Sequence, residues 1–224
     1  MTQSHPFQSI VAETLLIPLH MRAKESRRKN PILYDPAAER LAESLDYDYS
    51  PFDGARLSEV GCVVRGWYFD NAVRRFIRSH IHPVVVNVGC GLDTLRARHP
   101  EASFIFVMEG VLMYFYEKQV RSFLHHVASR FGGGEIWFDV CGTMMSKHGV
   151  KPDSLRHHEA QIRSGLSNGR LVEQWEPALH LLDQANYMKF FRRRWGFFFG
   201  QILGRIPWLC YRFSSLLGYE IRKE

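Results

Sequence analysis

The sequence contains few cysteines, and their spacing offers no metal site. Only four of the 224 residues are cysteines, and no two form a CxxC pair: Cys62, Cys90, Cys141 and Cys210. Three of them stand among apolar residues, where a free thiol packs as a small core side chain. We therefore expect neither a zinc site nor a disulfide framework, and this cysteine usage is typical of a reducing compartment.

Uncharged apolar runs long enough to cross a membrane are also missing. The most apolar late stretch, 195–217, is interrupted by polar and charged residues and a proline, whereas a spanning helix needs about 20 mostly uncharged residues. No charged region followed by an apolar stretch and a small-residue cleavage site is found, so no signal peptide is predicted. We expect a cytoplasmic protein without stable membrane insertion. Attachment to a membrane surface through Phe197-Phe198-Phe199 and Trp208 is an alternative.

The charged residues do not favour nucleic acid as a partner. The formal net charge is +6, with short basic runs at 27–29 and 192–194, and such runs usually form solvated faces. The sequence has no zinc finger, RNP motif or long basic helix, so we expect no binding of nucleic acid. The pairs His125-His126 and His157-His158 are neighbours that do not share a helix face, which favours surface positions over metal ligation.

The length of the chain suits effectively a single domain built in two parts. In the first part, 1–82, apolar residues recur at three- and four-residue steps, which predicts helices over about 11–45 and 62–80. Asp35-Pro36 marks one helix start, because aspartate is a preferred N-cap and proline fits the first helical position. We expect 1–82 to form an N-terminal helical cap.

The second part, 83–224, has the pattern of an α/β sheet. Runs of β-branched and aromatic residues predict strands at 83–88, 104–108, 135–140, 179–182 and near 219–222. Between the second and third runs, 116–131 has the apolar spacing of an amphipathic helix. Because alternating strands and helices are typical of βαβ units, we expect a mostly parallel sheet.

A glycine turn follows the first predicted strand. It reads Gly89-Cys90-Gly91-Leu92-Asp93-Thr94. Glycine at such a turn lets backbone N–H groups approach a ligand, since a Cβ would block that approach. Thr94 stands where the dinucleotide fingerprint requires its third glycine, so the turn is a poor NAD motif. A structural turn is the alternative, in which Asp93 supports the turn rather than a ligand.

Two longer motifs make the functional interpretation of this turn more specific. Residues 85–96, read as VVNVGCGLDTLR, closely resemble the first motif of the leucine carboxyl methyltransferase family, nearest to the bacterial branch named for tetracenomycin polyketide O-methyltransferase. Residues 108–115, MEGVLMYF, resemble the second diagnostic block of that family. Shorter matches extend the resemblance over nearly the whole chain, at 14–22, 30–38, 64–65, 70, 173–175, 192–195 and 206–207.

The resemblance implies a Rossmann-like, S-adenosylmethionine-dependent methyltransferase. Such an enzyme methylates an oxygen, often of a carboxylate or a phenol, on a small molecule such as a polyketide or another secondary metabolite. A small-molecule acceptor is therefore the expected partner and S-adenosylmethionine the expected cofactor. The identity of the acceptor, the oligomeric state and the catalytic residues are left open.

Carried over to this chain, the family pattern assigns cofactor binding to Lys24, Arg65, Gly89, Cys90, Gly91, Asp93 and Glu109. Arg65, assisted by Lys24 or Arg22, would hold the methionine carboxylate, since a guanidinium suits a bidentate carboxylate pair. Glu109 would sit beside the cofactor and Tyr114 would wall the substrate pocket. The alternatives are a surface cation for Arg65, a helix cap for Glu109 and a core aromatic for Tyr114.

One part of the family pattern is missing. In a Rossmann-like fold an acidic residue about 20 residues past the glycines ends the second strand and grips the ribose. Here only 92–103 separates the glycine turn from the next predicted strand, and beyond Asp93 its one acid is Glu101. The sheet is therefore predicted to lack strands two and three, through a shortening between about 98 and 104, which leaves strand one at the edge. A methyltransferase-fold binding protein without catalysis, or a faulty gene model, is the alternative.

Overall fold

The computed structural model describes residues 14–89, 103–155 and 160–223, and the chain divides into two compact units. The first unit extends to Trp67 and includes 151–161, while the second holds 68–150 and 162–224. Helix α4 (Arg56–Ser79) runs from the first unit into the second. The predicted boundary between cap and core after residue 82 stays a prediction.

The first unit is helical, as the sequence predicts for the cap. Its elements are α2 (Leu16–Ser26), α3 (Pro36–Ser44), the short turns η1 (Ser50–Phe52) and η3 (Asp153–Leu155), and the first half of α4. The predicted start of α3 is confirmed, because the carboxylate of Asp35 accepts a 2.9 Å hydrogen bond from the N–H of Ala38. Asp153 caps α4 from a distant part of the chain, accepting bonds from the N–H groups of Leu57 at 2.9 Å and Ser58 at 3.0 Å.

The core of the first unit is apolar with aromatic rings beside it. Its buried members are Leu16, Ile17, Met21, Phe52, Ala55 and Leu155. Next to them the ring of His20 stacks on Tyr49, with centroids 4.8 Å apart. Two buried carboxylates are paired with cations. Oε2 of Glu25 lies 2.9 Å from Nε of Arg28, and Oε2 of Glu59 lies 3.1 Å from Nζ of Lys24. These pairs reduce the cost of burying the two charges.

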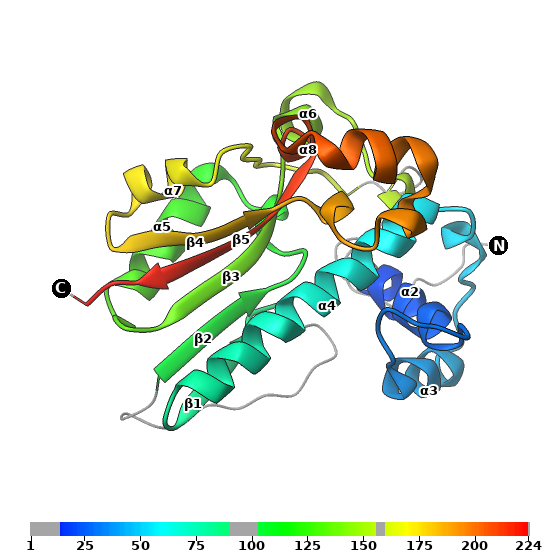
Figure 1. Ribbon diagram of the computed structural model, residues 1–224, viewed down its shortest axis with the longest axis horizontal. Helices are drawn as coiled ribbons and strands as arrows, with labels where there is room; N and C mark the ends of the chain where they lie inside the picture. Colours follow the sequence, from blue (N-terminus) through cyan, green and yellow to red (C-terminus); the bar gives the residue numbers. More distant parts are fainter. Residues whose placement is uncertain (1–13, 90–102, 156–159, 224) are drawn as a thin grey trace. The chain divides into compact units, whose positions relative to one another are not determined.

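The second unit contains a five-stranded sheet (Figure 1). The strands are β1 (Pro83–Asn87), β2 (Ser103–Met108), β3 (Glu135–Cys141), β4 (Leu179–Ala185) and β5 (Ser214–Ile221). They lie in the order β1-β2-β3-β5-β4, with β1, β2 and β3 parallel and β5 antiparallel to both of its neighbours. The predicted α/β, Rossmann-like fold with helices at the N-terminus is thereby confirmed.

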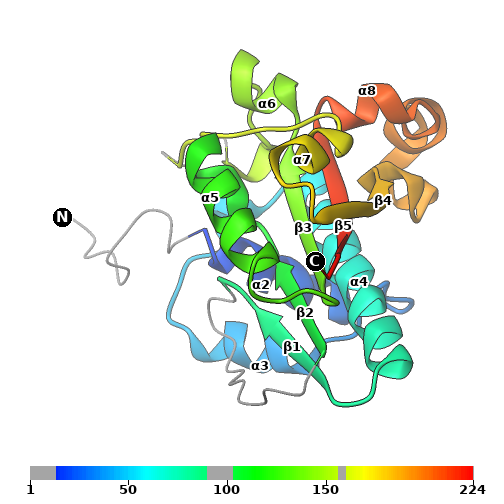
Figure 2. The same cartoon turned by 90° about the vertical axis from the view of Figure 1, so that its left-hand side faces the viewer.

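Helices cover both faces of the sheet (Figure 2). On one face α5 (Glu117–Ala128) and α7 (Arg170–Trp175) pack over the side chains of alternate strand residues, with Leu124, Phe138 and Tyr219 fully or almost fully buried. On the other face lies the second half of α4, where Arg75 stacks 4.8 Å over the ring of Trp137. This alternation follows from the two-residue period of a strand.

Strand β1 stands at one end of the strand order. Among the described residues it pairs with β2 alone, from Pro83↔Ser103 to Asn87↔Val107. If strands two and three of the family fold are lost, as predicted, strand one must lie at the edge of the sheet, and β1 does so. The shortening itself stays a prediction.

The connections within the second unit contain several short helices. After β2 and β3 come η2 (Leu112–Tyr114) and α6 (Thr143–His148). Between β4 and β5 lie η4 (Tyr187–Lys189), η5 (Arg192–Trp195), the π-helix η6 (Phe197–Ile202), η7 (Leu203–Arg205) and α8 (Pro207–Tyr211). In the described part of the chain, no helix combines the length and apolarity that a membrane crossing requires.

Candidate functional site

The carboxyl ends of the parallel strands β1, β2 and β3 point to one edge of the sheet. Val107 is level with Asn87 on one side and with Trp137 on the other, so β1 and β2 end together, whereas β3 continues beyond them to Cys141. The segments that follow β1 and β2, beginning with Gly89 and Glu109, therefore emerge side by side. Ligands of open α/β sheets bind beyond the carboxyl ends of the strands, so this edge is the candidate site.

Gly89 makes the turn after β1. The N–H of Val88 still donates to the carbonyl of Val107 at 2.7 Å, and the chain then turns at Gly89 with φ +68°. A Cβ added there would lie 2.6 Å from Cγ2 of Val111. Glycine is therefore required twice, by the left-handed backbone and by the close approach of the segment after β2. The exposed backbone at Gly89 suits close contact with a ligand.

Asp139 ties together the segments that end at this edge. It lies in β3, is 2% exposed, and accepts a 2.6 Å hydrogen bond from the N–H of Gly110. Its second oxygen accepts a 3.0 Å bond from the hydroxyl of Tyr187, just after β4. Buried carboxylates need such partners, because an unpaired buried charge is costly. Asp139 was not predicted as a site residue, although it is a single acid inside the apolar run 136–140, which was the available signal.

Glu109 and Tyr114 lie on the segment that follows β2. Glu109 is the first residue after that strand and is half-buried, and Gly110 next to it has φ +70°. Tyr114 ends η2 and is also half-buried. The preceding turn is held by the N–H of Arg163, which donates to the carbonyl of Met113 at 2.8 Å. Both residues are thus placed beside the candidate edge, and their roles in binding stay predictions.

The other five predicted cofactor residues lie either outside the described residues or in the first compact unit. Cys90, Gly91 and Asp93 lie outside the described residues. Lys24 and Arg65 belong to the first compact unit, so their predicted roles stay predictions.

Lys24 forms ion pairs with acidic residues of the first unit, chiefly with Glu59. Burial alone would raise the pKa of the Glu59 carboxyl, but hydrogen bonds from Arg28 and Lys24 hold that pKa below its usual value. The ammonium of Lys24 lies 3.1 Å from Glu59 and 3.8 Å from the carboxylate of Asp53. A carboxylate ligand at Lys24 would therefore compete with two resident acids.

A separate apolar crevice lies between α5, α7 and the sheet. Its lining residues are Leu112, Glu117, Val120, Leu124, Phe138, Val140, Ser164, Gly165, Leu166, Val172 and Trp175. The indole N–H of Trp175 is buried without a partner among the described atoms, and Arg121 stacks 4.4 Å over its ring. Neither Gly89 nor Glu109 lines this crevice, so we do not assign it to the predicted cofactor.

The described edge fits part of a cationic nucleoside ligand such as S-adenosylmethionine. Gly89 offers exposed backbone without a Cβ, and Glu109 brings a carboxylate to the same edge. Asp139 is already bonded to Gly110 and Tyr187, so it stabilises the turn instead of presenting both oxygens to a ligand. The roles of Gly89 and Glu109 in cofactor binding stay predictions.

Comparison with known proteins agrees with the resemblance seen in the motifs. The leucine carboxyl methyltransferase family matches residues 16–103. Tetracenomycin polyketide synthesis O-methyltransferase TcmP from Streptomyces glaucescens is 25% identical over 221 residues, covering 78% of this chain and 82% of that protein. The crystal structure of a DUF574 family protein from Streptomyces avermitilis matches 95% of this chain and 99% of its own, with a TM-score of 0.53. At 9% identity, that likeness shows a shared fold.

Proposed function

Because this chain is a relative of the leucine carboxyl methyltransferase family, we propose that it is an S-adenosylmethionine-dependent O-methyltransferase that acts on a carboxylate or hydroxyl of a small molecule. The observation that carries the proposal is the turn at Gly89. It lies inside the first family motif, at the carboxyl edge of the sheet, and it has no room for a Cβ beside Val111.

The proposed chemistry asks little of the protein beyond alignment and exclusion of water. S-adenosylmethionine supplies a methyl group on a sulfonium that is already reactive, so the gain comes from holding the acceptor oxygen in line. Asp139 fixes the turn at Gly110 and thereby positions Glu109. An acceptor carboxylate needs no general base, whereas a phenol would have to lose its proton.

The nature of the acceptor is proposed from the relative. TcmP is named as an O-methyltransferase of tetracenomycin polyketide synthesis. A polyketide-like or other aromatic secondary metabolite is therefore the first class of acceptor to test. We expect the methyl transfer to take place in the cytoplasm, the compartment that the sequence predicts.

Calorimetry with S-adenosylmethionine tests the cofactor site. We expect saturable binding by the purified chain and loss of binding in a Gly89→Val, Gly91→Val variant. Gly149→Val is the matched control, since Gly149 has the same φ of +68° and no atom within 4 Å of an added Cβ. Methyl transfer would then be followed by release of S-adenosylhomocysteine with carboxylate and phenol acceptors. A folded chain that binds no cofactor would reject the proposal.

A non-catalytic binding protein is the second candidate function. One observation that favours it is the edge position of β1. The other is the alignment with TcmP, which is 221 residues long but includes only 78% of this chain, or about 175 of its 224 residues, so that some 46 aligned positions have no counterpart here. This difference supports the predicted internal shortening. Cofactor binding without methyl transfer to any acceptor would favour this candidate. Sequencing of the transcript would test whether the shortening comes from a faulty gene model.

A further inference from the structure

The segment between β4 and β5 has a one-sided charge that the proposed methyl transfer does not use. From Gln184 to Tyr219 the sequence holds six basic residues and no acidic one: Lys189, Arg192, Arg193, Arg194, Arg205 and Arg212. Within this stretch, residues 187–211 form the short helices η4 to α8, drawn in orange to red-orange in Figure 1. A surface with charge of one sign attracts partners of the opposite sign.

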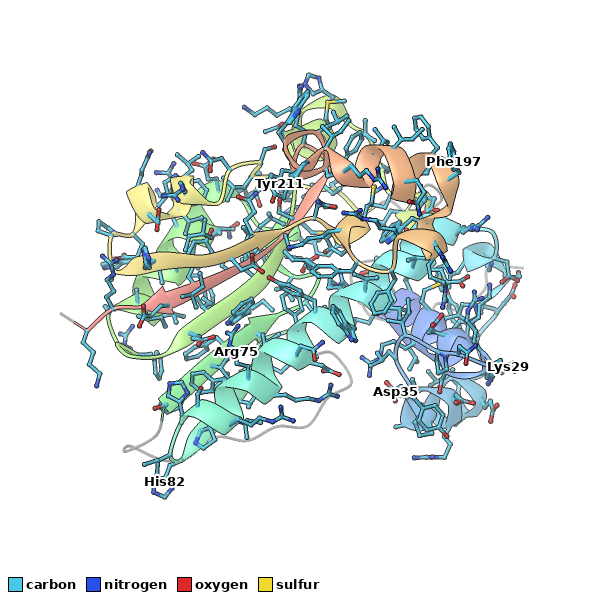
Figure 3. The ribbon with its side chains drawn as sticks, in the orientation of Figure 1. Lys29, Asp35, Arg75, His82, Phe197 and Tyr211 are labelled. Carbon is cyan, nitrogen blue, oxygen red and sulfur yellow. The ribbon has the colours of Figure 1, made fainter. Side chains whose placement is uncertain are left out.

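Large apolar side chains of the same segment are also exposed. The exposed fraction is 76% for Phe197, 57% for Phe198, 44% for Ile202 and 65% for Trp208. Figure 3 shows Phe197 at the outer side of its helical segment. Grouped apolar side chains of this size on a surface mark a place of interaction. We call Phe197, Phe198, Ile202, Trp208 and the six basic residues the aromatic-basic surface.

The aromatic-basic surface is carried by a packed scaffold. The indole N–H of buried Trp195 donates to the carbonyl of Phe190 at 3.0 Å, and the thiol of buried Cys210 donates to the carbonyl of Leu203 at 3.1 Å. Helices η6 and α8, which carry the exposed aromatics, both contact η7. The segment therefore has its own buried side, and the exposed apolar residues are its outward side.

We propose that the aromatic-basic surface binds the headgroup region of an anionic lipid bilayer. Aromatic side chains favour the membrane interface, and an apolar face flanked by Lys and Arg is the pattern of peripheral binding. Each basic residue near an anionic leaflet strengthens binding roughly fivefold. Aliphatic Ile202 suits acyl chains, whereas single-stranded nucleic acid would favour rings on which bases stack. The inference does not depend on methyl transfer.

Vesicle flotation of the full chain tests the proposal directly. Vesicles of phosphatidylcholine alone are compared with vesicles that also contain phosphatidylserine. We expect flotation with the anionic vesicles at about 0.1 M salt and marked weakening at about 1 M, where the Debye length falls to roughly 3 Å. No flotation on anionic vesicles at the lower salt concentration would overturn the proposal.

Two pairs of variants show whether this surface carries the binding. Phe197→Ser with Trp208→Ser removes two exposed rings, and Ile81→Ser with Leu182→Ser is the control, since these residues are 83% and 44% exposed elsewhere. Arg193→Gln with Arg205→Gln is compared with Arg78→Gln plus Arg130→Gln, all four being exposed. We expect about tenfold weaker anionic-vesicle binding or more for the surface variants and little change for the controls.

Thermal unfolding of each variant establishes that it is folded. Equal flotation of surface and control variants would overturn the proposal, because binding would then come from another part of the chain. Surface-dependent retention of RNA in the absence of any flotation would assign the surface to nucleic acid and also overturn it.

Discussion

The backbone N–H of Gly110 donates a 2.6 Å hydrogen bond to Oδ1 of Asp139, a carboxylate that is 2% exposed. Its other oxygen accepts from the hydroxyl of Tyr187 at 3.0 Å. One buried side chain thus holds the ends of three strand segments, because Gly110 follows β2, Asp139 lies in β3 and Tyr187 follows β4. The geometry of the turn that presents Glu109 depends on this carboxylate.

Replacing Asp139 by alanine tests that dependence. Asp139→Ala removes the carboxylate that accepts from the N–H of Gly110 and from the hydroxyl of Tyr187, and losing a hydrogen bond to a charged group costs about 1.5–3 kcal/mol. We expect a lower free energy of unfolding in urea and weaker S-adenosylmethionine binding by calorimetry. Asp139→Asn keeps one acceptor oxygen and should recover part of both. Unchanged binding in a stable Asp139→Ala variant would show that the turn does not depend on the carboxylate.

A comparison of Gly89 with Gly149 separates the cost of a left-handed backbone from the cost of crowding an added Cβ against a neighbouring side chain. Both have φ +68°, but an added Cβ meets Val111 at 2.6 Å only at Gly89, and nothing lies within 4 Å at Gly149. Gly149→Ala should cost about 1–2 kcal/mol from the left-handed backbone. Gly89→Ala should cost more by urea unfolding and should also weaken cofactor binding. Equal costs would mean that the segment after β2 moves away freely.

Much of the sheet could be predicted because its strands are continuous apolar runs. The observed β1 and β2 lie within one residue of the predicted ranges at 83–88 and 104–108. β5 was predicted only near 219–222, yet it begins at Ser214. Its first residues are serines, and Ser215 is fully buried through pairing with β3, which local composition does not reveal.

The candidate site was less predictable, since its geometry depends on tertiary contacts. Gly89 and Glu109 were found because they lie in sequence motifs. Asp139 and Tyr187 are 48 residues apart in the chain and meet only when β3 and the end of β4 are assembled. The crowding of Gly89 by Val111 likewise follows from the pairing of β1 with β2.

A second buried hydrogen bond supports the opposite face of the sheet. The hydroxyl of Tyr68, on α4, donates to Oδ2 of Asp183 at 2.6 Å, and burial together with this carboxylate raises the pKa of Tyr68 above its usual value. Tyr68→Phe should lower the free energy of unfolding by about 1.5–3 kcal/mol, because the acceptor is charged. The control is Tyr211→Phe, whose hydroxyl donates to the neutral carbonyl of Gln184 at 2.9 Å. It should cost about 0.5–1.5 kcal/mol in the same assay, and a Tyr68 variant no less stable than this control would contradict the argument.

The helical first unit should lose stability as the pH falls below neutrality, in part through His20. Burial lowers the pKa of His20 from its ordinary 6.5, and the nearby Asp53 only partly opposes this. Between the two pKa values, His20 therefore binds a proton in the unfolded chain but not in the folded chain. The stability that neutral His20 contributes is complete above about pH 6.5 and is lost as the pH falls toward the lower folded pKa. His20→Phe keeps a ring against Tyr49 but does not titrate. Urea unfolding between about pH 7.5 and 5 should show a flatter pH dependence for this variant than for the wild type, with exposed His126→Gln as the control. An identical slope in His20→Phe, or a wild type that gains stability on acidification, would refute the assignment.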